Sequence, residues 1–162
     1  MDDPLQHTTL NGTVDYINAL DGLCGHAQHH LVFFENDFDA CGFNSTARHD
    51  TLRTFLLASP ANRLYLLAHD TRQLAQSCPR LLLLLRQFSH ALRIYATPKH
   101  LAHLSEPFAV ADAAHYVRRF HFDDPRGIYA EHDAEGARML KSRFEEMWAS
   151  SHAAVSADTL GL

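Results

Sequence analysis

The chain has 162 residues, of which 46% are hydrophobic and 20% charged, as in an ordinary globular protein. Its 14 basic and 19 acidic residues give a formal net charge of −5, which repels phosphate backbones and argues against a nucleic-acid partner. The three cysteines (Cys24, Cys41 and Cys78) are widely spaced and form no CxxC pair. That spacing excludes a zinc knuckle and a disulfide framework, and it predicts a reduced, cytoplasmic protein.

Neither a targeting segment nor a membrane span is expected. The first residues, Met1 to Pro4, are acidic rather than basic and apolar, and the leucine run 81–85 is far too short to cross a bilayer. We predict a flexible N-terminus over residues 1–12, one α/β domain over 13–152 and a flexible tail over 153–162.

Apolar periodicity and chain breakers divide the domain into alternating strands and helices. The expected elements are, in chain order, a helix over 13–23, a strand over 31–34, a helix over 45–57, a strand over 63–68, a helical piece to 76, a helix over 80–90, a strand over 91–95, a helical turn over 100–104, a hairpin over 106–121, an edge strand over 126–131 and a helix over 133–150. This order predicts an α/β layered sandwich with a mostly parallel central sheet flanked by helices.

Two features of the predicted helices bear on how the layers are arranged. Arg48 falls on the solvent side of the helix over 45–57, opposite its apolar stripe. The five consecutive leucines of the helix over 80–90 make an apolar face too broad for one contact. That face is buried either between the sheet and another helix or against a second protein chain.

Two groups of side chains are candidate metal ligands. Glu35, Asp37 and Asp39 follow the first strand of the domain, where α/β proteins often place ligands, and carboxylates suit a hard cation. The alternative is a solvated loop. His26 and His30 are spaced to share one face of a helix, although the apolar run after His30 indicates that the helix ends first.

The candidate catalytic residues lie in the hairpin. Asp112 and His115 flank its turn, where a carboxylate that orients an imidazole makes a general base, and Arg118 supplies a positive charge for a phosphate. The alternative is a pair that only closes the turn. The sequence contains no GxSxG, GxGxxG, P-loop or HExxH pattern, and we predict no cofactor.

From Leu31 to Ser151 the order of elements resembles one half-domain of the phospholipase D superfamily. In that pattern, parallel strands lead to a His-x-Lys-x4-Asp motif, and a terminal helix carries aromatic residues like Phe144 and Trp148. If Asp112 occupies the aspartate position, the histidine position falls on Ser105 and the lysine position on Pro107. The nucleophile and the phosphate-neutralising charge are therefore both missing.

The resemblance implies a degenerate half-domain without catalytic activity. Active members of the superfamily bring two half-domains together at the site, so a half-length chain implies a homodimer. We expect an interaction or regulatory module, with a protein partner possible beyond the dimer. The alternatives are a phosphodiesterase or nuclease with a rearranged site around Asp112, His115 and Arg118, and a metal- or ligand-binding domain that uses the acidic loop over 35–39.

Overall fold

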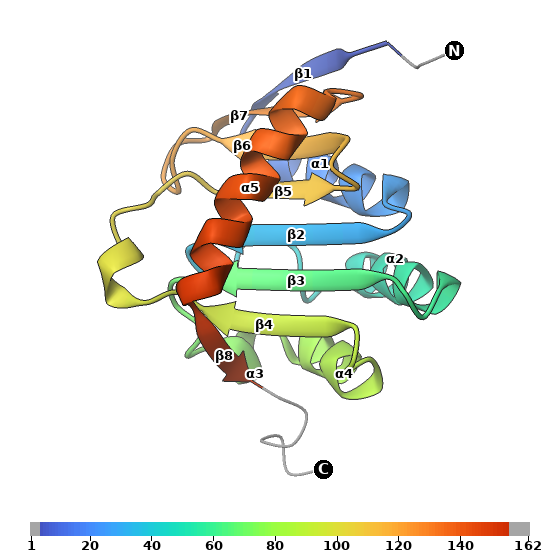
Figure 1. Ribbon diagram of the computed structural model, residues 1–162, viewed down its shortest axis with the longest axis vertical. Coiled ribbons are helices and arrows are strands. Elements are labelled where there is room, and N and C mark those ends of the chain that lie inside the picture. Colours follow the sequence, from blue (N-terminus) through green and yellow to red (C-terminus); the bar gives the residue numbers. More distant parts are fainter. Residues whose placement is uncertain (1–3, 156–162) are drawn as a thin grey trace.

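The computed structural model describes residues 4–155, which form one eight-stranded sheet with helices on both faces (Figure 1). The strands are β1 (Gln6–Asn11), β2 (His30–Glu35), β3 (Arg63–Ala68), β4 (Leu92–Ala96), β5 (Phe108–Ala111), β6 (His115–Arg119), β7 (Arg126–Glu131) and β8 (His152–Val155). The helices are α1 (Thr13–His26), α2 (Thr46–Ala58), α3 (Leu74–Ser77), α4 (Pro79–Gln87) and α5 (Ala134–Ser150), with a 3-10 turn at Lys99–Leu101. Among the described residues, no helix is long and apolar enough to cross a membrane.

The layered α/β architecture is confirmed, but the prediction of a mostly parallel sheet is wrong. The strand order is β1-β7-β6-β5-β2-β3-β4-β8, and in the described chain only the β2–β3 and β3–β4 pairs are parallel. The other five pairs are antiparallel. Parallel neighbours need a crossover connection, and helices α2, α3 and α4 supply crossovers only between β2 and β4.

Two edge strands lie in segments that we predicted to be flexible. Gln6–Asn11 pairs with β7, and His152–Val155 pairs with β4, so the sheet extends beyond both predicted domain limits. The signal was weak because an edge strand tolerates polar side chains, and only Leu10 of β1 is buried. Of the other residues predicted to be flexible, 1–3 and 156–162 lie outside the described part of the chain.

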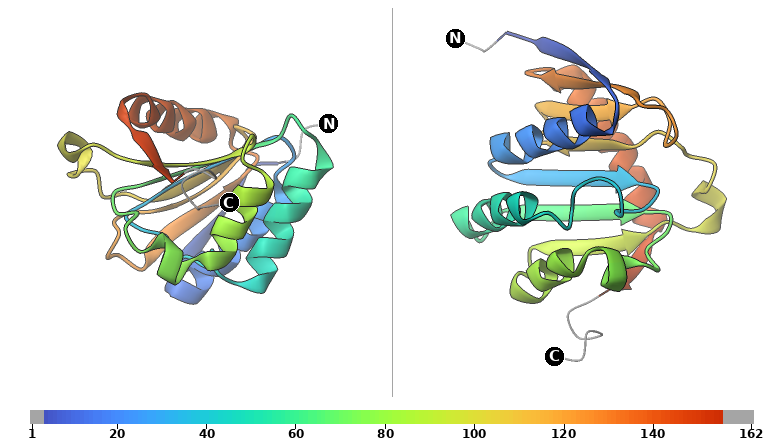
Figure 2. Two further views of the ribbon diagram at one scale, coloured as in Figure 1. Left: turned by 90° about the horizontal axis from the view of Figure 1, so that it is seen from below. Right: turned by 180° about the vertical axis from the view of Figure 1, so that it is seen from behind.

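The two faces of the sheet are covered unequally (Figure 2). Helices α1, α2, α3 and α4 lie on one face, here called the α1 face, and α5 crosses the other, called the α5 face. In α4 the side chains of Leu81, Leu82, Leu84 and Leu85 are buried in the core of the α1 face, and Leu83 alone of the run is exposed. The leucine-rich helix packs on the sheet beside α2, so its apolar face is buried by its own chain.

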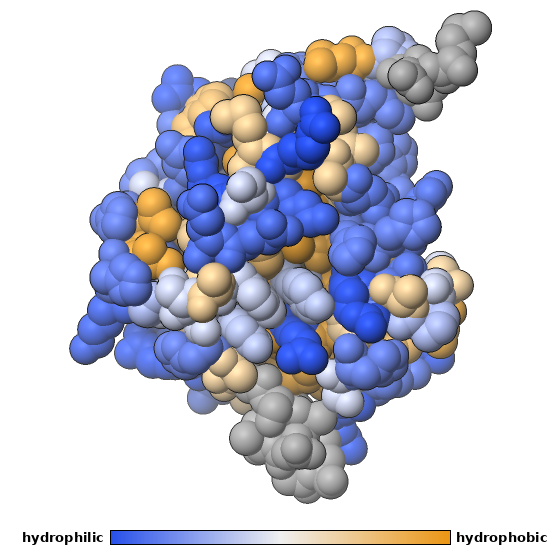
Figure 3. All heavy atoms as spheres, in the orientation of Figure 1, coloured by the Kyte–Doolittle hydropathy of each residue, from blue (hydrophilic) through white to orange (hydrophobic). Residues whose placement is uncertain are grey.

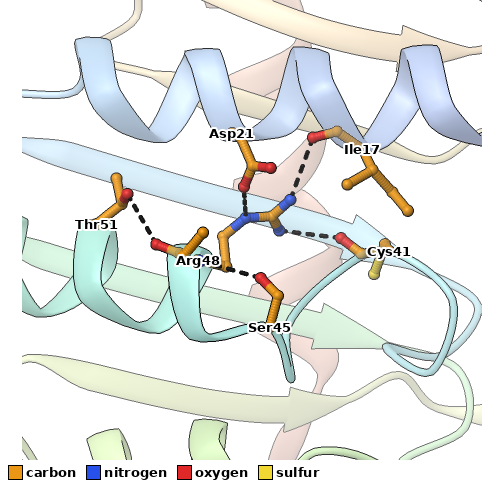
Figure 4. Close-up of polar contacts among 7 residues, drawn as sticks. Ile17, Asp21, Cys41, Ser45, Arg48 and Thr51 are labelled. Atoms are coloured by element: carbon orange, nitrogen blue, oxygen red, sulfur yellow. Dashed lines mark hydrogen bonds and ion pairs between the residues drawn. The ribbon is translucent and has the colours of Figure 1, made fainter.

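Arg48 is fully buried, which corrects the prediction that it faces solvent. Its Nε donates to the Asp21 carboxylate of α1 at 2.6 Å, and its terminal nitrogens donate to the carbonyls of Cys41 and Ile17 (Figure 4). The guanidinium lies 5.2 Å from the centre of the Phe43 ring. One side chain thus ties α1, the loop over residues 36–45 and α2 together.

Candidate functional site

Ser105 and Pro107, the positions that the resemblance assigns to the histidine and lysine of the motif, lie at the carboxyl end of β2 and β3. Ser105 and Pro107 precede β5 in an extended segment that β6 holds through its backbone. The Ser105 carbonyl accepts from Phe122 N–H at 2.8 Å, and the Pro107 carbonyl accepts from Arg119 N–H at 3.0 Å. Ser105 lines a hollow of about 350 Å³ on the α5 face, with Glu106 and Arg143 at its wall.

Two histidines lie at or beside this hollow: His103 lines it and is exposed, and His69 is occupied by other contacts. His69 follows β3, and its Nε2 donates to the Leu104 carbonyl at 2.7 Å while its Nδ1 bonds the Thr97 hydroxyl. Its ring packs edge-on against Phe34 and Phe122. Both ring nitrogens are already engaged, so His69 is a fixed structural side chain here and is not poised as a base.

Asp112 lies at the opposite end of the sheet and has a structural role. Its carboxylate accepts hydrogen bonds from the backbone N–H groups of Gln28, His29 and His30 at 2.8 to 2.9 Å. It stands in the left-handed region with φ 57°, which a short polar residue tolerates in a tight turn. We call this arrangement the Asp112 clamp.

The three candidate catalytic residues do not come together. His115 points to the α1 face, where its Nδ1 accepts from His132 N–H at 3.0 Å, and it does not bond the Asp112 carboxylate. Arg118 points to the α5 face at the far end of β6, where it pairs with Glu106 at 3.4 Å. Side chains of one strand alternate between faces, which separates residues 115 and 118. The rearranged phosphodiesterase site therefore lacks its geometry.

The candidate histidine ligands are also separated. His26 ends α1 and contacts the His115 ring at 5.2 Å, whereas His30 begins β2 and lines a hollow beside Lys141 on the α5 face. Burial and the charge of Lys141 lower the pKa of His30. Across residues 4–155, no group of three or more His, Cys, Asp or Glu side chains is placed to hold a metal ion.

The three carboxylates of the acidic loop over 35–39 do not point to one place. Glu35 is buried at the end of β2, Asp39 is exposed, and the Asp37 carboxylate accepts from the Asp39 backbone and the Asn36 amide. These bonds turn Asp37 back on its own loop, as in an Asx turn. The three carboxylates therefore do not form the predicted hard-cation site.

A polar cavity of about 370 Å³ opens beside Glu35 on the α1 face. We call it the Glu35 cavity. The hydroxyl of Tyr16, in α1, donates to the Glu35 carboxylate, and the guanidinium of Arg119, at the end of β6, lies 4.4 Å from the centre of the Tyr16 ring. Burial raises the pKa of Glu35 to about 7, against the opposing effects of the Tyr16 hydrogen bond and the Arg119 charge. A carboxyl group that exchanges its proton near neutral pH therefore lies at a cavity wall.

Only part of this arrangement was visible in the sequence. Glu35 was named as a candidate, but Tyr16 and Arg119 come from two other elements and no local spacing connects them. The loop over residues 36–45 forms one wall and is held by the Arg48 contact to Cys41 (Figure 4). Gly42 in that loop has φ 88°, and a β-carbon there would meet the Arg48 guanidinium at 3.0 Å.

Solved structures with a similar fold include a phospholipase D family member and proteins described in other terms. Nuc from Salmonella typhimurium, a phospholipase D family member, matches with a TM-score of 0.70 at 6% identity, covering 94% of this chain and 100% of its own. NucT from Helicobacter pylori matches with a TM-score of 0.59 at 11% identity, covering 93% and 99%. The phospholipase D-like fold is thereby confirmed, and identities this low show the fold alone.

Two further matches are longer proteins. TrmBL2, an archaeal chromatin protein described with a mode of DNA binding, matches with a TM-score of 0.69 at 11% identity over 92% of this chain. Phosphatidylserine synthase from Haemophilus influenzae Rd KW20 matches with a TM-score of 0.61 at 12% identity over 99% of this chain. This chain spans 54% of the first and 42% of the second.

Comparison of sequences adds a family but no activity. No curated protein matches the chain. The model of a family described as a domain of unknown function, DUF7931, matches residues 13–159, which include every strand of the sheet except β1. The chain belongs to the DUF7931 family.

Proposed function

We propose that this protein is a non-catalytic interaction module with a phospholipase D-like fold, which associates with a second copy of itself. The observation that carries the proposal is the replacement of the superfamily's histidine and lysine positions by Ser105 and Pro107, in a segment whose backbone is bound to β6. Proline offers neither charge nor donor. Of the two histidines beside Ser105, His69 has both nitrogens engaged, and His103, which lines the same hollow, is exposed to solvent.

Self-association is proposed at the carboxyl end of the sheet and not at the leucine-rich helix α4. In the superfamily, half-domains meet at the motif, and Phe120 is exposed beside the motif segment here. The Arg118 and Arg126 guanidiniums lie 5.9 and 6.0 Å from the centre of its ring. An exposed aromatic ring between arginines is typical of the central residues of protein interfaces.

We also propose a cytoplasmic location and a protein partner instead of a nucleic acid. Free, buried cysteines at positions 24, 41 and 78 are compatible with a reducing compartment. The formal charge of −5 argues against DNA, although TrmBL2 shares the fold. DNA binding is therefore one outcome that the experiment must be able to reveal.

Sedimentation velocity tests self-association directly. We expect a dimer for the unmodified chain and a shift toward monomer for Phe120→Ser. Leu57→Ser is the matched control, since Leu57 is exposed at the end of α2, on the α1 face of the sheet. A monomer at all accessible concentrations would refute the self-pairing module.

Activity is tested separately. The unmodified chain and Ser105→Ala should both leave a chromogenic phosphodiester unhydrolysed, with and without divalent metal ions. Hydrolysis that Ser105→Ala abolishes would make the protein an enzyme. If the chain binds duplex DNA at low salt and still binds it at physiological salt, the partner is a nucleic acid and not a protein.

A further inference from the structure

The Glu35 cavity lies on the opposite face of the sheet from the motif segment. Glu35 and Arg119 point to the α1 face, whereas the hollow around Ser105 lies on the α5 face. The cavity's lining is mainly polar and includes Tyr16, Glu35, Asp37, Arg119 and Asp123. A volume of about 370 Å³ suits a small metabolite and not a polymer.

Arg119 lines this cavity, and protein acceptors engage its guanidinium only weakly. Its Nε is buried and has no hydrogen-bond partner within residues 4–155, and a terminal nitrogen makes a long contact of 3.5 Å to the Asp124 carbonyl. The face of its guanidinium is used by the Tyr16 ring. A buried donor without an acceptor is costly, and a guanidinium edge prefers a carboxylate or phosphate oxygen. The weakly engaged terminal nitrogens of Arg119 are therefore suited to an anionic oxygen in the cavity.

The same cavity carries an excess of acid. Glu35, Asp37 and Asp123 all line it beside the single guanidinium of Arg119, although the Asp37 carboxylate is bonded to its own loop and the Asp123 side chain is 94% exposed at the rim. The Tyr16 hydroxyl satisfies one oxygen of Glu35, but it is a neutral group. A positive charge placed beside Glu35 favours the ionised carboxylate that burial otherwise opposes. The cavity is therefore also suited to a cation.

We propose that the Glu35 cavity binds a small zwitterion, in which an amine is combined with a carboxylate or a phosphate. The anionic group accepts from Arg119, and the ammonium donates to Glu35 and the rim carboxylate of Asp123. An anion alone meets three carboxyl groups, and a cation alone leaves the terminal nitrogens of Arg119 weakly engaged. Self-association at Phe120 plays no part in this site.

Titration calorimetry with four probes separates the sources of the ligand. L-Serine presents an amine and a carboxylate, phosphoethanolamine presents an amine and a phosphate, and ethylamine and inorganic phosphate each present one charge. We expect heat of binding and thermal stabilisation with one or both zwitterions, and weaker or absent responses to the single-charge probes. The stronger zwitterion identifies the anionic group. No response to either zwitterion, or an equal response to ethylamine or phosphate alone, would overturn the proposal.

Variants assign the contacts. Glu35→Gln and Arg119→Lys should each weaken zwitterion binding roughly tenfold to a hundredfold, the range for loss of one charge-assisted hydrogen bond. The exposed Asp123, changed to asparagine, should weaken it a few-fold without disturbing the fold. Glu106→Gln is the matched control, since Glu106 is an exposed carboxylate at the same end of the sheet on the other face.

Proton release gives a readout that a structural role of Glu35 would not produce. At neutral pH, docking of the ammonium should expel a fraction of a proton from Glu35, which calorimetry detects as a dependence of the heat on the buffer's ionisation enthalpy. The dependence should vanish in Glu35→Gln and persist in Glu106→Gln. Binding that is unchanged in Glu35→Gln and Arg119→Lys would place the ligand elsewhere and refute the proposal.

Discussion

Replacement of Glu35 by glutamine should stabilise the protein at neutral and alkaline pH. Glu35 is 4% exposed, and burial raises its pKa from 4.5 to about 7. The native state therefore holds a proton on Glu35 between pH 4.5 and 7 that the unfolded chain releases. The stabilisation that comes from holding this proton on Glu35 is fully present below pH 4.5 and is lost as the pH rises to about 7. Glutamine keeps the shape and the Tyr16 hydrogen bond, and it cannot ionise.

The size of the effect follows from the pKa difference. A change from 4.5 to about 7, at about 1.4 kcal/mol for each pH unit, gives about 3 kcal/mol. This value is an upper limit, because the structure can relax around the charged carboxylate. The free energy of unfolding of Glu35→Gln, relative to the unmodified chain, should therefore rise by 2 to 3 kcal/mol, as an order of magnitude, between pH 4.5 and pH 8.

Urea denaturation monitored by Trp148 fluorescence at a series of pH values measures this difference, since Trp148 stacks on Tyr95 and Tyr65 and reports the packing of α5. Glu145→Gln, an exposed carboxylate on the same helix as the reporter, is the control and should show a flat difference. A flat difference for Glu35→Gln as well would refute the reasoning, because it would mean that Glu35 is ionised in the native state throughout.

Three further predictions concern residues outside the Glu35 cavity. Arg48→Met should lower the free energy of unfolding by about 3 kcal/mol, because it leaves the Cys41 and Ile17 carbonyls without their donor, and a double-mutant cycle with Asp21→Asn should show coupling; additive single-mutant effects would contradict it. Asp112→Asn should cost about 2 kcal/mol in urea denaturation, because asparagine tolerates the left-handed turn but loses the charge and one acceptor of the clamp; an unchanged midpoint would refute its role. Burial and the charges of His132 and His26 lower the pKa of His115, so the unfolded chain binds its proton more readily and stability should fall as the pH drops through about 6.5. His115→Gln should reduce that fall, and an unaltered pH profile would count against it.

The sequence was most informative where the signal is local. The strand over 63–68 has the predicted limits, and the helix that ends at Ser150 begins at the predicted cap, where the Asp133 carboxylate accepts from Gly136 N–H at 3.0 Å. Both elements are predicted by patterns in consecutive residues: an apolar run for the strand, and a cap followed by amphipathic periodicity for the helix. The phospholipase D-like fold followed from the order of such elements.

Features that depend on distant partners were not visible. Arg48 looked exposed because its carboxylate partner, Asp21, is 27 positions away and its other acceptors are backbone carbonyls. β5 pairs directly with β2 and runs antiparallel to it, and hydrophobicity does not encode that choice of neighbour and direction. The Glu35 cavity joins α1, β2 and β6, so no motif of fixed spacing describes it.

The strand order also has a consequence for how the sheet opens. Its antiparallel half, β1-β7-β6-β5, and its other half, β2-β3-β4-β8, are joined along the single ladder between β2 and β5, which spans four residue pairs. The Asp112 clamp closes one end of that ladder across 82 to 84 positions of chain. Contacts so distant along the chain form slowly, and they define a boundary between cooperative units. Amide hydrogen exchange at Phe108–Ala111 should therefore report a partial opening in which the two halves separate while each remains folded.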